Sequence, residues 1–304
     1  MDTYTQTYTY TYTYTYTYTY NLTASIVVYQ NDFCKLKKTI DSFFDNSLKS
    51  KLYIIDNSPT KILGEQIGLD ERINYIFNDG KNIGYGSAHN KAIAQVSSSN
   101  SSKYHLILNP DISFGPGALD KLHSIMEEDS SIGLLTPKIL YPDGRTQSCC
   151  KLVPTPLNLL ARRFLRLKSL SNLNNKYEMI PTGYNKVMEV PIISGCFMFF
   201  KISTLQEIGL FDQRYFMYLE DVDICRRVHL SHNKNNNKNN NKNNNKNNNK
   251  VVFNPSVSIY HDYEKGSYKN LTLLTHHIIS SIKYFNKWGW VWDKDRDRIN
   301  QMID

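Results

Sequence analysis

Residues 24–56 read ASIVVYQNDFCKLKKTIDSFFDNSLKSKLYIID, and they contain two short apolar runs at 24–29 and 52–55. Both runs are rich in β-branched or aromatic residues and have the length of buried strands. Between them, Asp32 is suited to cap a helix. Helical spacing then follows in the apolar residues Leu36, Ile40, Phe43 and Phe44. The stretch therefore predicts a strand, a helix and a second strand.

The same alternation continues along the chain. Strands are predicted at 73–77 and 104–108, with a helix over 87–96 between them. This rhythm predicts an α/β fold: a Rossmann-like, mostly parallel sheet flanked by helices. In such sheets ligands bind beyond the carboxyl ends of the strands. Four polar features fall at those ends: Tyr29, Asp56, the loop at 78–86 and Asp111.

The second half of the chain has a less regular pattern. It predicts a strand at 132–139, an apolar segment at 190–200, a helix at 219–230, short strands at 251–253 and 257–260, and a helix at 271–288. We expect one large domain over residues 23–268 and a small C-terminal helical extension over 269–304.

Two low-complexity tracts interrupt this pattern. Residues 3–20 alternate Thr and Tyr apart from Gln6, and residues 233–250 contain only Asn and Lys. We expect residues 1–22 to be disordered, with edge pairing or aggregation as the alternative, because the alternation is far longer than a strand of roughly 5–6 residues. The Asn-Lys tract has no apolar residue, so we expect a solvated surface loop inserted into the domain.

The net charge of +8 raises the question of nucleic-acid binding. Five lysines lie in the Asn-Lys tract, so the rest of the chain carries 8 − 5 = +3. Most of the excess charge therefore belongs to a low-complexity segment, which argues against a nucleic-acid partner.

Cysteine usage and hydropathy bear on location. The chain has five cysteines without metal-ligand spacing, which favours reduced thiols and a cytoplasmic protein. The N-terminus lacks the pattern of a secretion signal. The most apolar window, 190–200, is shorter than the roughly 20 residues that span a bilayer.

Carboxylates at strand ends are the first candidate site residues. Asp56 closes the strand in IIDNS and can accept the N3–H of a pyrimidine base, although a turn or helix-capping role is more common for one aspartate. Asp111 in LNPDI can hold Mg²⁺ or Mn²⁺ on a diphosphate, and a Pro-Asp turn explains it equally well.

The segment KNIGYGSAHNKA supplies a second group of candidates: Asn82, Gly84, Gly86 and Asn90. Its glycines permit close approach of a ligand to the backbone, and the helix after them presents its positive end to phosphate. An ordinary loop-to-helix turn would show the same residues.

Acidic residues begin the helix predicted after the aromatic segment FDQRYFMYL. Glu220, Asp221 and Asp223 partly compensate the helix dipole, but a carboxylate in a partly apolar cleft can also act as a base. His261 in SIYHDY is a candidate metal ligand, and a structural role is the commoner explanation for one histidine.

Taken together, eight segments resemble the inverting family 2 glycosyltransferases, in particular the bacterial rhamnosyltransferase-like branch with a GT-A fold. The resemblance covers residues 23–268 apart from the Asn-Lys tract. The segments, in the order of the family, are SIVVYQND, IIDNS, NIGYGSAHNKA, LILNPDI, PKILYPDGRTQSC, VPIISGCFMFFK, IGLFDQRYFMYLEDVDICRR and IYHDYEKGS.

The resemblance implies a role for each matching residue. Asp221 corresponds to the general base, and Glu220 to a residue that orients the acceptor or the base. Asp111 corresponds to the last residue of the metal motif, with Asn109 in place of the first aspartate, and His261 completes the metal or diphosphate site. Asp56 corresponds to the base-binding aspartate, and Gly195 to the acceptor-side loop. The nucleotide-sugar pocket is expected to comprise Tyr29, Asp56, Asn82, Gly84, Asn90, Asn109 and Gly195.

The resemblance further implies a sugar transfer that uses Mg²⁺ or Mn²⁺, a dTDP- or UDP-sugar donor and a glycan or lipid-linked acceptor. We expect dTDP-rhamnose as donor, and polysaccharide or lipopolysaccharide assembly as the process. The alternatives are a sugar-nucleotide nucleotidyltransferase, which would need a glycine-rich loop after the first strand, and a non-catalytic binding protein, which need not retain Asp56, Asp111 and Asp221.

Two segments have the composition of membrane-surface helices. Residues 157–170 interleave apolar and basic residues, and residues 276–292 combine three tryptophans with lysines. Packing within the domain explains either segment equally well. A peripheral position on the inner face of the cytoplasmic membrane would suit a lipid-linked acceptor.

Overall fold

The computed structural model describes residues 18–159, 171–238, 249–263 and 270–303 of the 304-residue chain. The disorder predicted for residues 1–17 lies outside the described residues. So do most of the predicted membrane-surface helix at 157–170 and the middle of the Asn-Lys tract.

The strands that the pattern predicts are present, together with several short ones. They are β1 (Leu22–Val28), β2 (Ser50–Asp56), β3 (Ile73–Phe77), β4 (Tyr104–Leu108), β5 (Ile112–Ser113), β6 (Ile132–Leu140), β7 (Cys150–Lys151), β8 (Met188–Glu189), β9 (Ile192–Ile193), β10 (Phe197–Lys201) and β11 (Lys250–His261).

Helices alternate with these strands in the first half and cluster at the end of the second. They are α1 (Phe33–Phe44), α2 (Ile62–Ile67), α3 (Tyr85–Ser99), α4 (Ala118–Glu128), α6 (Ser171–Tyr177), α7 (Ile202–Ile208), α8 (Glu220–Lys238), α10 (Leu271–Trp288) and α11 (Lys294–Asn300). The side chain of Asp32 caps α1 by accepting from the Lys35 amide, as predicted.

Nine strands form the central sheet, in the order β3-β2-β1-β4-β10-β6-β11-β5, with β8 paired to β11. The first four of these strands run parallel, as the strand–helix pattern predicts. β10 runs antiparallel between β4 and β6, and β6 pairs in parallel with β11. The carboxyl ends of β1, β2 and β4 therefore meet at one edge, where a ligand site is expected.

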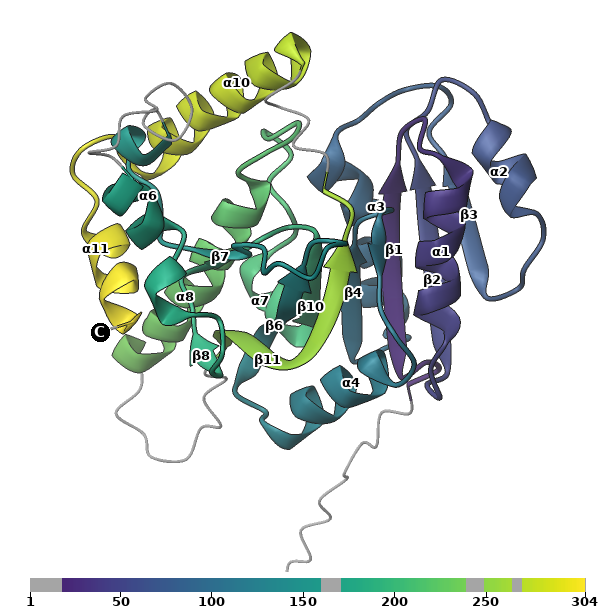
Figure 1. The fold of residues 1–304 in the computed structure, drawn as a ribbon, viewed down its shortest axis with the longest axis horizontal. Coiled ribbons are helices and arrows are strands. Elements are labelled where there is room, and N and C mark those ends of the chain that lie inside the picture. Colours follow the sequence, from purple (N-terminus) through teal and green to yellow (C-terminus); the bar gives the residue numbers. More distant parts are fainter. Residues whose placement is uncertain (1–17, 160–170, 239–248, 264–269, 304) are drawn as a thin grey trace, which may run out of the picture.

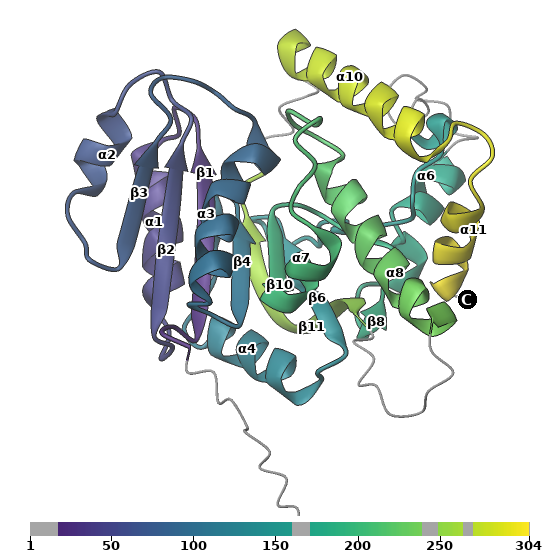
Figure 2. The ribbon, with the colours of Figure 1, turned by 180° about the vertical axis from the view of Figure 1, so that it is seen from behind.

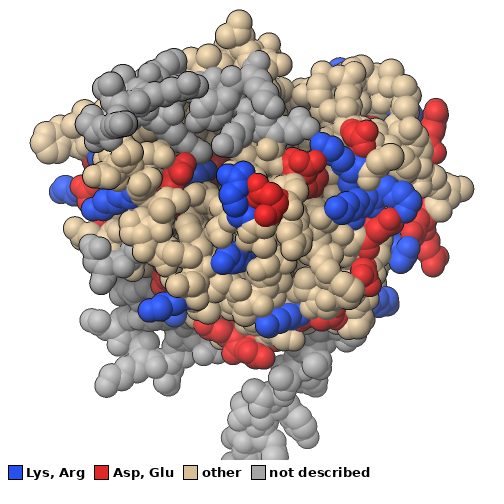
Figure 3. Space-filling view, in the orientation of Figure 1, with Lys and Arg blue, Asp and Glu red and all other residues tan. Residues whose placement is uncertain are grey.

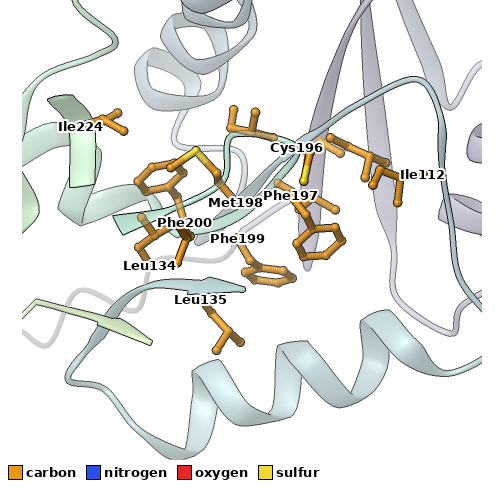
Figure 4. Close-up of a cluster of buried hydrophobic side chains, with 14 of the residues drawn as sticks. Ile112, Leu134, Leu135, Cys196, Phe197, Met198, Phe199, Phe200 and Ile224 are labelled. Atoms are coloured by element: carbon orange, nitrogen blue, oxygen red, sulfur yellow. The ribbon is translucent and has the colours of Figure 1, made fainter. Parts of the chain in front are cut away.

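Helices cover both faces of this sheet. Figures 1 and 2 show α1 and α4 on one face and α3, α7 and α8 on the other. The core is continuous between these layers. Figure 4 shows its centre, where Phe197, Met198, Phe199 and Phe200 of β10 point alternately to the two faces and meet Leu134, Leu135 and Ile224. Strands buried on both faces in this way read as unbroken apolar runs.

The ends of the low-complexity tracts differ from the prediction. Tyr20 pairs with Ser102 and Leu22 begins β1, so the predicted disorder is wrong for these residues. In the Asn-Lys tract, residues 233–238 continue α8 and Lys250 begins β11. Asn249 is buried and bonds to Thr204 and Glu207, so a solvated loop is wrong for both ends of the tract.

One further difference concerns the second half. The strands predicted at 251–253 and 257–260 are one strand, β11, because an irregularity between Asn254 and Ser258 keeps it paired to β6. The C-terminal extension packs against the domain: the Arg226 guanidinium forms a buried ion pair with Asp293, and Trp288 donates to Asp223 at 2.8 Å. In the described part of the chain, no helix is long and apolar enough to cross a bilayer.

Candidate active site

A cleft of about 500 Å³ lies at the carboxyl ends of β1 and β4. Side chains from both halves of the chain line it, in the regions where strands end and α8 and α10 begin. Among the predicted site residues, those that line the cleft are Tyr29, Asn82, Asn109, Asp111, Gly195, Glu220, Asp221 and His261.

Asp111 and His261 face each other across one wall of the cleft. His261 Nε2 lies 3.3 Å from Asp111 Oδ1, and β11 pairs antiparallel with β5 at this point. Both atoms are buried and neither has a hydrogen-bond partner of good geometry. A cation bound between these two atoms would give each of them the partner that it lacks.

Gln147 fixes the orientation of the His261 ring. Its Oε1 lies 3.0 Å from His261 Nδ1, and its amide nitrogen donates to the His261 carbonyl oxygen at 2.8 Å. Because Oε1 can only accept, Nδ1 carries the proton. In the neutral ring Nε2 then presents its lone pair towards Asp111, which is the tautomer of a metal ligand.

The surroundings of His261 favour a positive charge. Burial lowers the pKa of His261, but Cys196 and Asp111 outweigh burial and raise it to about 10. Hard divalent ions prefer oxygen ligands, and Mg²⁺ in particular keeps waters and substrate phosphates in its shell. Among the described residues, no group of three His, Cys, Asp or Glu side chains could hold a metal. The donor set therefore fits a divalent ion that takes its remaining ligands from a diphosphate and water.

Tyr85 joins the two sides of the cleft. Its hydroxyl lies 2.7 Å from the Gly195 carbonyl oxygen and 3.0 Å from Asn109 Oδ1. The ring packs edge-on against His89 in the core. Burial, followed by the charge of Glu220, raises the pKa of Tyr85 well above its usual value, so the hydroxyl keeps its proton and donates.

Asp221 is held by backbone amides. Its Oδ2 accepts from the Gly195 amide at 3.0 Å and its Oδ1 accepts from the Val222 amide at 2.8 Å. A Cβ added to Gly195 would lie only 3.3 Å from Asp221 Cβ, so the small residue permits this close approach. The carboxylate is thus oriented at the first turn of α8, where it lines the cleft.

Glu220 is the buried member of the acidic pair. Only 6% of it is exposed, and its Oε2 has no hydrogen-bond partner. Burial, reinforced by the charge of Asp221, raises the pKa of Glu220 well above the usual range of a carboxyl. Glu220 therefore favours the neutral form, whereas ionising it would place two adjacent charges in a poorly solvated site.

The backbone before the acidic pair is strained. Tyr218 and Leu219 are non-glycine residues with φ of 69° and 66°. Such conformations cost of order 1–3 kcal/mol each and cluster at functional sites. The strain ends the aromatic loop abruptly and turns Glu220 and Asp221 into the cleft at the start of α8.

An asparagine network holds the loop before α3 against β2. Asn57 donates to Asn82 Oδ1 at 3.2 Å and accepts from Asn78 at 2.6 Å. Asn82 Oδ1 also accepts from the Gly84 amide at 3.0 Å. The network positions Asn57 and Asn82 on the cleft wall.

Three predicted pocket residues lie outside the cleft lining. Asp56 is fully buried, and its oxygens accept from the Ser58 amide and the Tyr75 hydroxyl. Asn90 uses both ends of its amide on the Phe211 backbone. A Cβ on Gly84 would clash with the Phe216 carbonyl oxygen, so this glycine allows close packing of two loops. In this geometry all three residues shape the walls of the site, and a contact with nucleotide remains a prediction.

Several residues that line or support the cleft were not predicted. They are Asn57, Tyr85, Gln147, Lys151, Cys196 and Tyr218. Tyr85 and Gln147 lie inside the segments NIGYGSAHNKA and PKILYPDGRTQSC, but nothing in their spacing distinguishes them from their neighbours. Their roles depend on partners that are distant in the chain: 110 residues separate Tyr85 from Gly195, and 114 residues separate Gln147 from His261.

Comparisons with known proteins agree with this picture. No family model matches the chain. An N-acetylglucosaminyl-diphospho-decaprenol L-rhamnosyltransferase of Mycobacterium tuberculosis is 28% identical over 162 residues, which are 49% of this chain and 51% of that protein. The rhamnosyltransferase WbbL of Escherichia coli K12 is 26% identical over 210 residues, which cover 64% of this chain and 72% of that protein. The alignment with the mycobacterial enzyme thus spans about half its length.

Solved structures show the same fold at low sequence identity. The structure of GalNAc-T7 with UDP, GalNAc and Mn²⁺ superposes with a TM-score of 0.60 at 14% identity, over 92% of this chain and 49% of that one. The mannosyltransferase PcManGT of Pyrobaculum calidifontis, in complex with GDP-Man and Mn²⁺, gives 0.52 at 14% identity over 88% and 65%. With the parallel sheet and the cleft at its carboxyl edge, the chain has the GT-A fold of these structures, and in sequence it is similar to the curated rhamnosyltransferases.

Proposed function

We propose that the chain is an inverting glycosyltransferase that moves L-rhamnose from dTDP-rhamnose onto a glycan or lipid-linked acceptor in cell-surface polysaccharide or lipopolysaccharide assembly. One observation carries the proposal. A single cleft in a GT-A fold contains the facing pair Asp111 and His261 and the backbone-held Asp221, with Tyr85 in contact with both sides. The names of the relatives supply the class of sugar.

Asp111 and His261 would hold Mg²⁺ or Mn²⁺. When bound, such an ion neutralises charge on the diphosphate leaving group, which is worth several kcal/mol in a transition state. The side chain of Gln147 keeps His261 Nε2 directed at Asp111. Lys151 lines the same cleft, and its ammonium adds a positive charge for an anionic donor.

Asp221 would act as the general base. Its carboxylate takes the proton of an acceptor hydroxyl while the hydroxyl oxygen forms a bond to the anomeric carbon of the donor sugar. The bond from that carbon to the diphosphate breaks, and the nucleoside diphosphate leaves with the electron pair. Attack from the side opposite the leaving group inverts the anomeric centre. A positioned base contributes about 10²–10⁴ in rate.

Glu220 would act beside the base as a neutral donor. Its raised pKa keeps the carboxyl protonated, and its unpartnered Oε2 is available to a sugar hydroxyl. One neutral acid beside one carboxylate lets the two residues hold a hydroxyl without repelling each other. Its role is then to position the acceptor for Asp221.

A lipid-linked acceptor would place the protein at a membrane. The mycobacterial relative is named for a diphospho-decaprenol substrate. By analogy we propose a lipid diphosphate glycan as acceptor, and a peripheral position at the cytoplasmic face of the membrane.

The proposal is tested by incubating the purified full-length chain with dTDP- and UDP-sugars, Mn²⁺ and a glycosylated lipid diphosphate. Transfer from dTDP-rhamnose with inversion is expected, detected by mass spectrometry and by the anomeric coupling of the product. Asp221→Asn should lower kcat about 10²–10⁴-fold and leave donor binding intact. Asp41→Asn, an exposed aspartate of α1, is the matched control.

Two outcomes would contradict the proposal. Near-native turnover by Asp221→Asn would exclude Asp221 as the general base. Release of pyrophosphate from a nucleoside triphosphate and a sugar phosphate, with no glycoside formed, would identify a nucleotidyltransferase instead.

A further inference from the structure

We infer that the outer face of α10, together with the segment 290–292 after it, docks on an anionic lipid bilayer. We call this surface the α10 face, and we define it by Leu271, Ile278, Ile279, Ile282, Trp290 and Trp292. The inference deepens the proposed function by naming the surface that meets the membrane. It rests on that function only for its purpose, because lipid binding is measured independently of sugar transfer.

The α10 face exposes large apolar side chains in a continuous arrangement. Leu271 is 80% exposed and Trp292 is 92% exposed, and the three isoleucines and Trp290 are between 42% and 45% exposed. Leu271, Ile278 and Ile282 recur at intervals of seven and four, so they share one side of the helix. Scattered exposed apolar residues are common, but a contiguous group on one helix side marks an interaction surface.

The opposite side of α10 is firmly attached, so the apolar face is directed outward. Ser280 donates to the Met217 carbonyl oxygen at 2.8 Å, and Lys287 pairs with buried Asp223 at 2.6 Å. Tyr284 and Phe285 are buried. Rotating the helix to hide the isoleucines would break these contacts. Figures 1 and 2 show α10 along the outer edge of the molecule, beyond the sheet.

The charge of α10 favours an anionic partner. The described residues 270–292 contain two lysines and two histidines and no aspartate or glutamate; Lys283 is exposed, whereas Lys287 is turned inward to Asp212 and Asp223. In Figure 3 the described atoms at the tip of α10 are tan, and the red side chains lie below it. Apolar side chains flanked by lysine and tryptophan, without acidic residues, suit the interface of a bilayer that contains anionic lipid. A soluble acidic protein would not require this many exposed aliphatic side chains.

The α10 face is continuous with the cleft. Leu273, on the same helix, lines the cleft beside Met217 and Tyr218. The ring of His276 stacks on Phe216 with centroids 4.4 Å apart, which ties the start of α10 to the loop before Glu220. Docking through α10 would therefore bring the mouth of the cleft to the membrane surface, where an acceptor with a lipid tail resides.

The test is flotation of the full-length chain with vesicles of phosphatidylcholine and phosphatidylglycerol, and with vesicles of phosphatidylcholine alone. We expect binding that depends on phosphatidylglycerol and weakens with salt. The double variant Ile278→Ser with Ile282→Ser should bind at least about tenfold more weakly, because two side chains no longer enter the apolar layer. The control is Leu69→Ser with Val187→Ser, which removes two apolar side chains, 108% and 61% exposed, outside the α10 face.

The outcomes separate the possibilities. Loss of flotation in the isoleucine variant alone, with wild-type transfer to a water-soluble acceptor, supports the inference. Equal flotation of both variants overturns it. A wild-type chain that is dimeric in light scattering, together with an isoleucine variant that is monomeric, also overturns it, because the face would then bind a second copy of the chain. If the wild-type chain binds vesicles but transfers no sugar, the proposed function is contradicted and this inference is still supported.

Discussion

The region from β1 to β5 and the region from β6 to α11 both line the cleft but are built differently. In the first, parallel strands alternate with helices, and site residues such as Asn57 and Asn109 directly follow a strand. In the second, site residues lie on loops, at the start of α8 and at the end of β11. Gly195 lies between β9 and β10, and Asp221 follows two residues with positive φ.

This difference shows how each region positions its site residues. In the first region, the parallel strands β1, β2 and β4 end at one edge, so the polar residues that follow them converge there, and short-range bonds such as those of Asn57 to Asn78 and Asn82 fix them. In the second, position depends on individual long-range bonds, such as those of Gly195 to Asp221 and Trp288 to Asp223. Substitutions in the second region should therefore affect the site through distant supports, and four experiments compare the two regions and the contacts between them.

The largest effect is expected at the ion pair that attaches the C-terminal extension. Arg226 and Asp293 are almost fully buried, and Arg226 also lies over the Trp288 ring. Asp293→Asn would leave a buried guanidinium charge unpaired, which typically costs about 3–5 kcal/mol. We expect urea denaturation to show this loss as one shifted transition of the whole chain. Asp295→Asn, in an exposed pair on α11, should have little effect. A wild-type midpoint for Asp293→Asn would mean that the extension is an independent appendage.

The next effect concerns the pair that spans the two regions. Asp111→Asn should weaken binding of Mn²⁺ in the presence of a nucleoside diphosphate at least about 100-fold, since loss of even an outer-shell partner costs 10–100-fold. Calorimetry measures this without turnover. Asp262→Asn changes the exposed neighbour of His261, which pairs with Lys35, and should bind Mn²⁺ as wild type does. Unchanged affinity in Asp111→Asn would exclude this pair as the metal site.

The contrast between the regions also explains what the sequence could predict. The first four strands, the Asp32 cap and the bounds of α10 followed from periodicity and capping, because these are properties of neighbouring residues. Eight predicted residues line the cleft, and they include all four with assigned catalytic or metal roles. The resemblance to the glycosyltransferase family gave these residues their predicted roles, because each residue considered alone could equally have had a structural role.

The remaining features depend on contacts that no local pattern encodes. Asn90 looks like a ligand residue at the start of a helix, yet its amide is used by the Phe211 backbone, 121 residues away. Asn249 ends a tract without apolar residues, and it is buried because Thr204 and Glu207 lie beside it. Pairing across such separations is decided by tertiary structure.

A smaller effect is expected at Tyr85, where one hydroxyl connects the regions. Tyr85→Phe removes the bond to the Gly195 carbonyl, and Gly195 in turn orients Asp221. Losing one such bond is worth about 1 kcal/mol, so kcat should fall by roughly fivefold to tenfold. The KM for the donor should stay unchanged, because Tyr85 acts on the position of the base. A rise in KM at constant kcat would instead indicate that Tyr85 binds the donor directly.

The smallest effect is a pH dependence that belongs to the second region alone. Burial and Asp221 raise the folded-state pKa of Glu220, so the folded chain holds this proton more tightly than the unfolded chain. Stability from this group is complete below the ordinary glutamate pKa of about 4.3 and is lost as pH rises towards the raised folded value. Glu220→Gln keeps a neutral donor there. Its stability relative to wild type should therefore increase with pH across that window, and its kcat should lack the alkaline decline that ionised Glu220 causes in wild type. Parallel stability and activity profiles of the two proteins over the whole window would show that Glu220 is already ionised in the folded chain, so that the cleft accommodates the charges of Glu220 and Asp221 together.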